Sequence, residues 1–119
     1  LRPGGIFHSS MQPKNGVEMY GRMVYREISP PERLVWVNSF ADAAGNVAQS
    51  PYFAANQFPL EVYNVLTLKE RSGKTVLTIK GSPINASEGE LEFYHSMFPS
   101  MEKGFGGTFD KLKEYLKSL

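Results

Sequence analysis

Apolar residues follow two different periods along the chain, and the change falls at Pro83. Before Pro83 they alternate with polar residues at a period of about two, which is typical of β-strands. Beyond it the period is about 3.6, which is typical of amphipathic helices. Turn residues divide the first part into predicted strands at residues 6–11, 17–28, 33–41, 61–70 and 74–81.

Adjacent prolines mark the turn between the second and third of these strands. Neither Pro30 nor Pro31 can donate a hydrogen bond to a sheet ladder, so the chain must turn there. The other predicted hairpin turns are Lys14-Asn15-Gly16 and Ser72-Gly73, because Asn and Gly accept positive φ. A predicted loop covers residues 42–59, and loops of that length in a compact domain are usually functional or mobile.

Two helices are predicted after Pro83. Ser87 and Glu90 form the capping-box pattern S-x-x-E, which opens a short helix. Pro99 fits the first turn of a second helix, where its missing N–H costs nothing. The second helix has one apolar stripe, formed by Met101, Phe105, Phe109, Leu112 and Leu116.

The predicted fold class is therefore α+β, an antiparallel meander closed by a long C-terminal amphipathic helix. The helix must bury its stripe, and one face of the curved sheet is the available partner. The third strand has two distinct faces, with Leu34, Trp36, Asn38 and Phe40 on one and Val35, Val37 and Ser39 on the other.

Composition narrows the class of protein. The 119 residues are enough for a single domain with one core, and we expect one domain over residues 1–119. The net charge is +1 and no basic block is longer than two residues, which argues against a nucleic-acid or membrane-surface partner. No apolar stretch is long enough to span a membrane, and there are no cysteines. We therefore expect a cytoplasmic protein.

Three glycines lie within four positions of the second predicted helix. Gly104, Gly106 and Gly107 each cost about 1 kcal/mol relative to alanine, so something should offset them. One interpretation is close packing of the helix on the sheet, or a kink in the helix, and a compatible one is that bare backbone widens space for a ligand. Close packing predicts that Gly107→Leu costs ~1–3 kcal/mol through overpacking.

Residues of catalytic or metal-binding type show no useful spacing. His8 and His95 are the only histidines, and a metal site would need both of them with distant carboxylates. Gly73-Lys74-Thr75 ends like a phosphate-binding loop, but a strand follows it instead of a helix. We assign no catalytic residue, no metal ligand and no cofactor.

Aromatic and methionine side chains form the remaining candidate set. Plain hydrophobic core is the stronger single explanation for them. The alternative is the wall of a ligand cavity, because a helix lying across a curved sheet rarely fills the concavity and methionine adapts to varied guests. Asn38 favours the second interpretation, since a buried amide needs water, backbone or a ligand as its partner.

Several short motifs are similar to one known family. They are Gly4-Gly5, Gly21, the run of residues 27–35, Gly73-Lys74-Thr75 and residues 101–112. These resemble the bacterial homologues of the activator of heat-shock protein 90 ATPase, a family of the START-like, SRPBCC superfamily with the helix-grip fold. The resemblance covers almost the whole chain. In the family a first strand and two short helices lie upstream, so we expect the domain to be N-terminally incomplete here.

The resemblance implies three functional hypotheses. The first is a non-enzymatic module that binds a small hydrophobic or aromatic ligand between the sheet and the last helix. The second is a co-chaperone that stimulates a heat-shock protein 90 ATPase, and the third is a polyketide cyclase-like enzyme. For the first, the ligand-binding residues are Phe7, Met23, Trp36, Asn38, Phe40, Met101, Phe105 and Phe109.

The expected cavity has a floor, a roof and a mouth. Trp36 and Phe40 should line the floor, Phe105 and Phe109 the roof, and Asn38 should orient the guest. Tyr52, Phe53 or Phe58 of the long loop should cover the mouth. Without the upstream segment, a sheet edge and part of the apolar face would be open to water, so we expect the chain to be incomplete or to self-associate.

Overall fold

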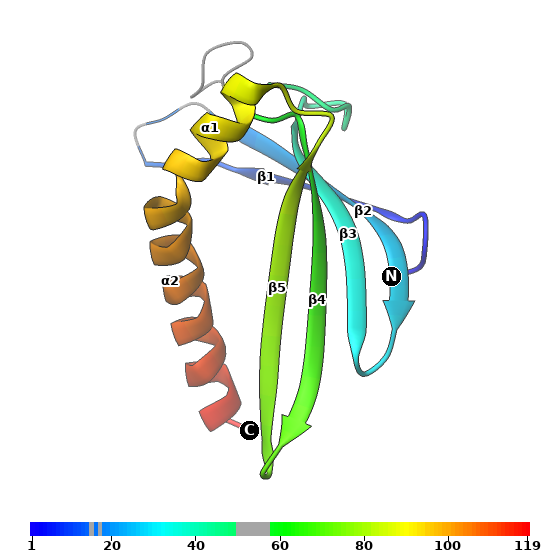
Figure 1. Ribbon diagram of the computed structural model, residues 1–119, viewed down its shortest axis with the longest axis vertical. Helices are drawn as coiled ribbons and strands as arrows, with labels where there is room; N and C mark the ends of the chain where they lie inside the picture. Colours follow the sequence, from blue (N-terminus) through cyan, green and yellow to red (C-terminus); the bar gives the residue numbers. More distant parts are fainter. Residues whose placement is uncertain (15, 17, 50–57) are drawn as a thin grey trace.

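The computed structural model describes residues 1–14, 16, 18–49 and 58–119. Within these residues the chain forms an antiparallel sheet followed by two helices (Figure 1). The α+β class and the order of elements predicted above are confirmed. The elements are β1 (Ile6–Met11), β2 (Met19–Ser29), β3 (Arg33–Ala41), β4 (Glu61–Arg71), β5 (Lys74–Ile84), α1 (Glu88–Ser96) and α2 (Phe98–Lys117).

The sheet is a simple meander in which each strand pairs with its neighbours in sequence. The spatial order is β1-β2-β3-β4-β5, and every pairing is antiparallel. The predicted turns are found where the structure describes them. Ser72 and Gly73 both have positive φ, 53° and 76°, and the Pro30–Pro31 peptide bond is cis. Asn15 of the first predicted turn lies outside the described residues.

The two faces of the central strand β3 are buried to different extents. Val35 and Val37 are 1% and 3% exposed, whereas Asn38 and Phe40 on the other face are only half-buried. The register places Val37 between Val24 of β2 and Tyr63 of β4, so the side chains of the neighbouring strands flank it on that face. The face with Asn38 and Phe40, here called the cleft face, depends for cover on the helices.

Local signals define both helices. The Ser87 hydroxyl accepts from the Glu90 amide at 3.2 Å, and the Glu90 carboxylate accepts from the Ser87 amide at 2.9 Å, so the predicted capping box is present at the start of α1. Pro99 lies in the first turn of α2, as predicted. Neither helix of the described part is long and apolar enough to cross a membrane.

The prediction that α2 buries its stripe on the sheet is wrong. None of the α2 residues is buried. Phe105 is 47% exposed and Leu116 is 57% exposed. The helix runs along one side of the sheet (Figure 1) but stands away from the cleft face. Amphipathicity correctly indicates which side of the helix faces the sheet, but it does not set the distance between them.

The expected close approach of the helix glycines is also wrong. A β carbon built on Gly104, Gly106 or Gly107 would meet nothing within 4 Å outside the local helix backbone. Without a sheet in contact, Gly107→Leu has no neighbour to overpack. The cost of the three glycines is therefore not offset by packing, and the interpretation that bare backbone leaves room beside the sheet is the one compatible with the geometry.

Replacing Gly107 by alanine should stabilise the protein. The substitution meets open space and removes the entropic cost of a helical glycine, so the free energy of unfolding should rise by about 1 kcal/mol. Chemical denaturation checks this, with Gly73→Ala as the matched control. Gly73 also has open space around it, but its φ of 76° should make alanine destabilising there. A loss of stability in Gly107→Ala would contradict the open geometry.

Candidate functional site

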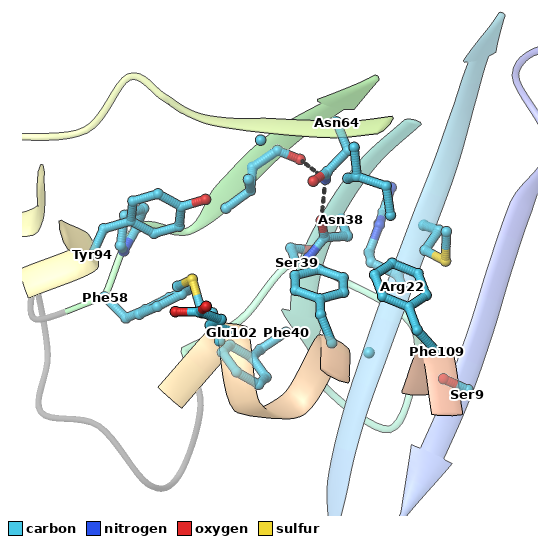
Figure 2. A pocket seen from close by; sticks show the side chains of 18 of the residues that line it. Ser9, Arg22, Asn38, Ser39, Phe40, Phe58, Asn64, Tyr94, Glu102 and Phe109 are labelled. Carbon is cyan, nitrogen blue, oxygen red and sulfur yellow. Dashed lines mark hydrogen bonds between the residues drawn. The ribbon is translucent and has the colours of Figure 1, made fainter. Parts of the chain in front are cut away.

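A cleft of about 780 Å³ separates the cleft face of the sheet from α2. Strands β2 to β5 form one wall, and the first half of α2 forms the opposite wall. Phe58 and Pro59, which precede β4, close one end together with Tyr94 of α1. Figure 2 shows these side chains converging on the open space from the sheet, α1 and α2.

Most of the residues that the sequence proposed as ligand-binding lie around this cleft. Its lining includes Met23, Asn38, Phe40, Met101, Phe105 and Phe109.

Phe7 and Trp36 do not line the cleft. Trp36 shares a strand face with Asn38, but it lies two residues nearer the start of β3 and is half-buried opposite Tyr25. Phe7 is 53% exposed on the edge strand β1 and lines a smaller hollow of about 350 Å³ near the N-terminus. Strand alternation gives the correct face for both residues, but it cannot say how far along the strand the cleft extends.

An aromatic cluster holds the closed end of the cleft together. Phe58 lies at its centre, with ring centroids 5.8 Å from Phe40, 6.2 Å from Phe93 and 5.9 Å from Tyr94. Edge-to-face contacts at such distances are favourable beyond the area they bury. Phe58 therefore connects α1 to the sheet instead of acting as a simple cover for the mouth. Tyr52 and Phe53, the other residues expected there, lie outside the described residues.

Tyr94 brings a hydroxyl group into this otherwise apolar end. Its side chain is 8% exposed, and its ring also packs edge-on against Phe98 at 5.5 Å. Burial raises the pKa of the Tyr94 hydroxyl, because the charged phenolate would lose its water. The group is therefore protonated at neutral pH and can donate a hydrogen bond into the cleft.

Two asparagines form an amide pair on the sheet wall. Asn64 of β4 is 7% exposed, and its Nδ2 donates to Asn38 Oδ1 and, at 3.1 Å, to the carbonyl of Val62. Figure 2 draws both bonds. Asn38 was singled out from the sequence and Asn64 was missed. The signal was available, because Asn64 shares a strand face with the apolar residues Val62 and Leu66, just as Asn38 shares one with Trp36 and Phe40.

Gly81 of β5 leaves space between two of these polar groups. A β carbon at this position would lie 3.0 Å from Asn64 Oδ1 and 3.1 Å from the Tyr94 hydroxyl oxygen. Both contacts are tighter than normal packing, so any side chain here would displace one of the polar groups. Glycine is the residue that keeps both oxygens accessible from the cleft.

Charged groups are few on the described lining. They are Arg22 and Glu102. The Arg22 guanidinium donates one hydrogen bond to the carbonyl of Gly45 at 2.8 Å, which connects it to the loop after β3. Glu102 is exposed on the α2 side of the cleft (Figure 2), and in the part of the chain that the structure describes it forms no ion pair.

Neither histidine lines the cleft. His8 stacks on Tyr20 with ring centroids 5.7 Å apart, and its Nε2 donates to the Asp42 carbonyl at 3.1 Å. The Asp42 carboxylate accepts from the Asn46 amide at 2.9 Å, which lowers its pKa below the ordinary value. His95 stacks on Phe98 at 5.0 Å. Within residues 1–14, 16, 18–49 and 58–119, no group of three or more acidic or histidine side chains could hold a metal ion.

Comparisons with known proteins identify relatives of this architecture. A family model described as "Activator of Hsp90 ATPase homolog 1-like protein" matches residues 1–117. Among solved structures, the crystal structure of protein Ms6760 from Mycobacterium smegmatis superposes with a TM-score of 0.63 at 25% sequence identity. The match covers 87% of this chain but only 58% of that one. No curated protein matches the chain.

Proposed function

The chain belongs to the family of Activator of Hsp90 ATPase homolog 1-like proteins, in the SRPBCC superfamily, and from that premise we propose that it binds a small, largely apolar molecule without transforming it. The observation that carries the proposal is the cleft of about 780 Å³ between the sheet and α2. A space of this size, with aromatic side chains on both walls and a few convergent polar groups, has the general character of small-molecule sites.

The exposure of the α2 wall supports binding energetically. Phe105 is 47% exposed and Phe109 is 38% exposed, so both rings can still lose water when a guest covers them. Covering about 300 Å² of apolar surface at ~25 cal/mol per Å² is worth about 7.5 kcal/mol, which corresponds to a Kd in the micromolar range. Phe40 and Met23 on the sheet wall would contact the other side of the same guest.

The polar groups on the sheet wall and at the closed end of the cleft support binding rather than chemistry. Asn38, Asn64 and the protonated Tyr94 hydroxyl are neutral at pH 7. Neutral groups of this kind orient a ligand through hydrogen bonds, but they do not exchange protons readily near neutral pH.

Substituting one residue on each wall tests the proposal. Nile red, a neutral apolar dye, should bind with micromolar affinity, and Phe105→Ala and Met23→Ala should each weaken binding about five- to tenfold through lost apolar contact. Dye fluorescence measures affinity directly. Emission of Trp36, the one tryptophan of the chain, is a second readout because Trp36 pairs with Asn64 across the sheet.

Tyr115→Ala is the matched control for these variants. Tyr115 is also on α2 and is 60% exposed, but it does not line the cleft, so its removal should leave dye affinity unchanged. If Tyr115→Ala weakens the dye as much as Phe105→Ala while Met23→Ala has no effect, the dye binds on the outer face of the helix. That result, or an absence of binding, would contradict the proposed function.

A further inference from the structure

We propose that the cleft selects neutral molecules that carry a hydroxyl group, and that this group binds between Asn64 and Tyr94 beside Gly81. The inference rests on the proposed function and adds the chemical class of the ligand. It makes Gly81 a residue that determines specificity, although a glycine contributes no functional group of its own.

Two oxygen atoms at the closed end of the cleft have unused hydrogen-bonding capacity. Asn64 and Tyr94 are more than nine-tenths buried. Among the described residues, no hydrogen bond involves Asn64 Oδ1 or the Tyr94 hydroxyl. In the described part of the chain, every side-chain polar atom that is fully enclosed has a hydrogen-bond partner. Because these two oxygens have none, they are not fully enclosed and must face open space. The space that both residues line is the cleft.

The limit on the spacing of the two oxygens admits a single bridging atom. They lie 3.0 Å and 3.1 Å from the point where a β carbon of residue 81 would be, so they are at most 6.1 Å apart. A ligand hydroxyl that donates one hydrogen bond and accepts another, each of about 2.8 Å and at a roughly tetrahedral angle, bridges groups about 4.6 Å apart, which lies within that limit. The missing side chain of Gly81 is therefore the feature that lets a ligand reach both groups.

The chemistry of the two groups selects the ligand atom. Asn64 Oδ1 can only accept a hydrogen bond, and the buried Tyr94 hydroxyl is protonated and can donate one. A ligand hydroxyl donates to the first and accepts from the second through one oxygen. An ether or a ketone cannot donate. An ammonium group cannot accept, and burying its charge between neutral groups would be costly.

The closed end of the cleft disfavours acidic ligands. The two charged residues on the described lining are Arg22, which donates to the Gly45 carbonyl, and Glu102. A carboxylate bound between Asn64 and Tyr94 would lose its water against two neutral groups. The phenylalanine rings on both walls favour a flat aromatic body for the molecule that carries the hydroxyl.

Three naphthalene derivatives of equal ring size separate the effect of hydrogen-bond donation from the effect of a negative charge. Naphthol has the hydroxyl, its methyl ether keeps the oxygen but cannot donate, and naphthoate is anionic at pH 7. Measured by displacement of Nile red, naphthol should bind about tenfold more tightly than the methyl ether, because the ether leaves Asn64 Oδ1 unpaired. Naphthoate should bind most weakly of the three.

Two variants should weaken naphthol, and they differ in their effect on its methyl ether. Tyr94→Phe deletes only the hydroxyl from which both ligands accept, so it should weaken both about tenfold. Gly81→Ala fills the gap beside Asn64 and Tyr94, so it should weaken naphthol about tenfold and reduce its preference over the methyl ether. The matched controls are Tyr63→Phe, an exposed hydroxyl outside the cleft lining, and Gly89→Ala, which meets nothing within 4 Å. Both controls should keep the preference.

The outcomes distinguish this inference from the proposed function. If naphthol and its ether bind equally and Tyr94→Phe changes neither, the cleft binds apolar molecules but the hydroxyl site is wrong. A fourth derivative, the cationic naphthylmethylamine, is measured in the same way, and if it binds more tightly than naphthol the site selects a cation and the inference is again wrong. If neither Nile red nor any naphthalene binds, the proposed function itself fails. Tyr94→Phe keeps the test decisive should Gly81→Ala not fold.

Discussion

Phe58→Ala is expected to lower the free energy of unfolding by about 3 kcal/mol. The ring of Phe58 contacts Phe40 of the sheet and both Phe93 and Tyr94 of α1, at centroid distances of 5.8 to 6.2 Å. Truncating a phenylalanine in such a cluster removes its buried area and its edge-to-face contacts and leaves a cavity. Because Phe58 connects α1 to the sheet, hydrogen exchange should become faster in α1 than in the central strands.

The matched control for Phe58→Ala is Leu60→Ala. Leu60 is only two residues away in the sequence, but it is 45% exposed, so its truncation should cost much less than the loss of Phe58. Urea denaturation of the two variants measures the difference. Equal losses, or unchanged exchange in α1, would mean that α1 is held to the sheet by other contacts.

Asn64→Leu should destabilise the protein by about 2 kcal/mol. Leucine has a similar volume but cannot donate, so Asn38 Oδ1 loses its partner beside the sheet. The same substitution removes the acceptor at the closed end of the cleft and should abolish the preference for naphthol over its methyl ether. Denaturation and dye displacement on the same variant therefore report on stability and on specificity.

A double-mutant cycle separates the amide pair from general effects of the substitution. With both partners replaced, in Asn38→Leu/Asn64→Leu, no amide is left unpaired, so the double variant should be destabilised by less than the sum of the two single variants. Strictly additive losses would show that Asn38 and Asn64 do not stabilise one another.

Predictions that depend on local chemistry are confirmed. The Ser87–Glu90 capping box, the position of Pro99 and the Ser72-Gly73 turn each need only a few neighbouring residues. The bounds of β3 also agree with the prediction, because its alternation is regular and the Pro30–Pro31 turn precedes it. Residues this close in sequence have few alternative arrangements, so their chemistry is enough to determine the outcome.

Predictions that depend on distance between elements are less successful. The stripe of α2 was expected to be packed on the sheet, and Gly104 or Gly107 was expected at the closest approach, yet the helix stands across an open cleft. Trp36 was expected in the cavity floor, but the cleft does not reach it. A hydrophobic pattern predicts which surface of an element faces inward, but it does not predict how closely the opposite surface approaches.

By itself, the sequence determined the α+β class, the strand order of the meander, both helix starts and the face of β3 that carries Asn38 and Phe40. These follow from periodicity, turn residues and capping, which act over a few residues. The tertiary structure alone decided that Phe58, Asn64, Gly81 and Tyr94 meet at one end of a cleft. These four residues come from the segment before β4, from strands β4 and β5, and from helix α1. They meet because of the register of the sheet and the packing of α1 at the end of the sheet.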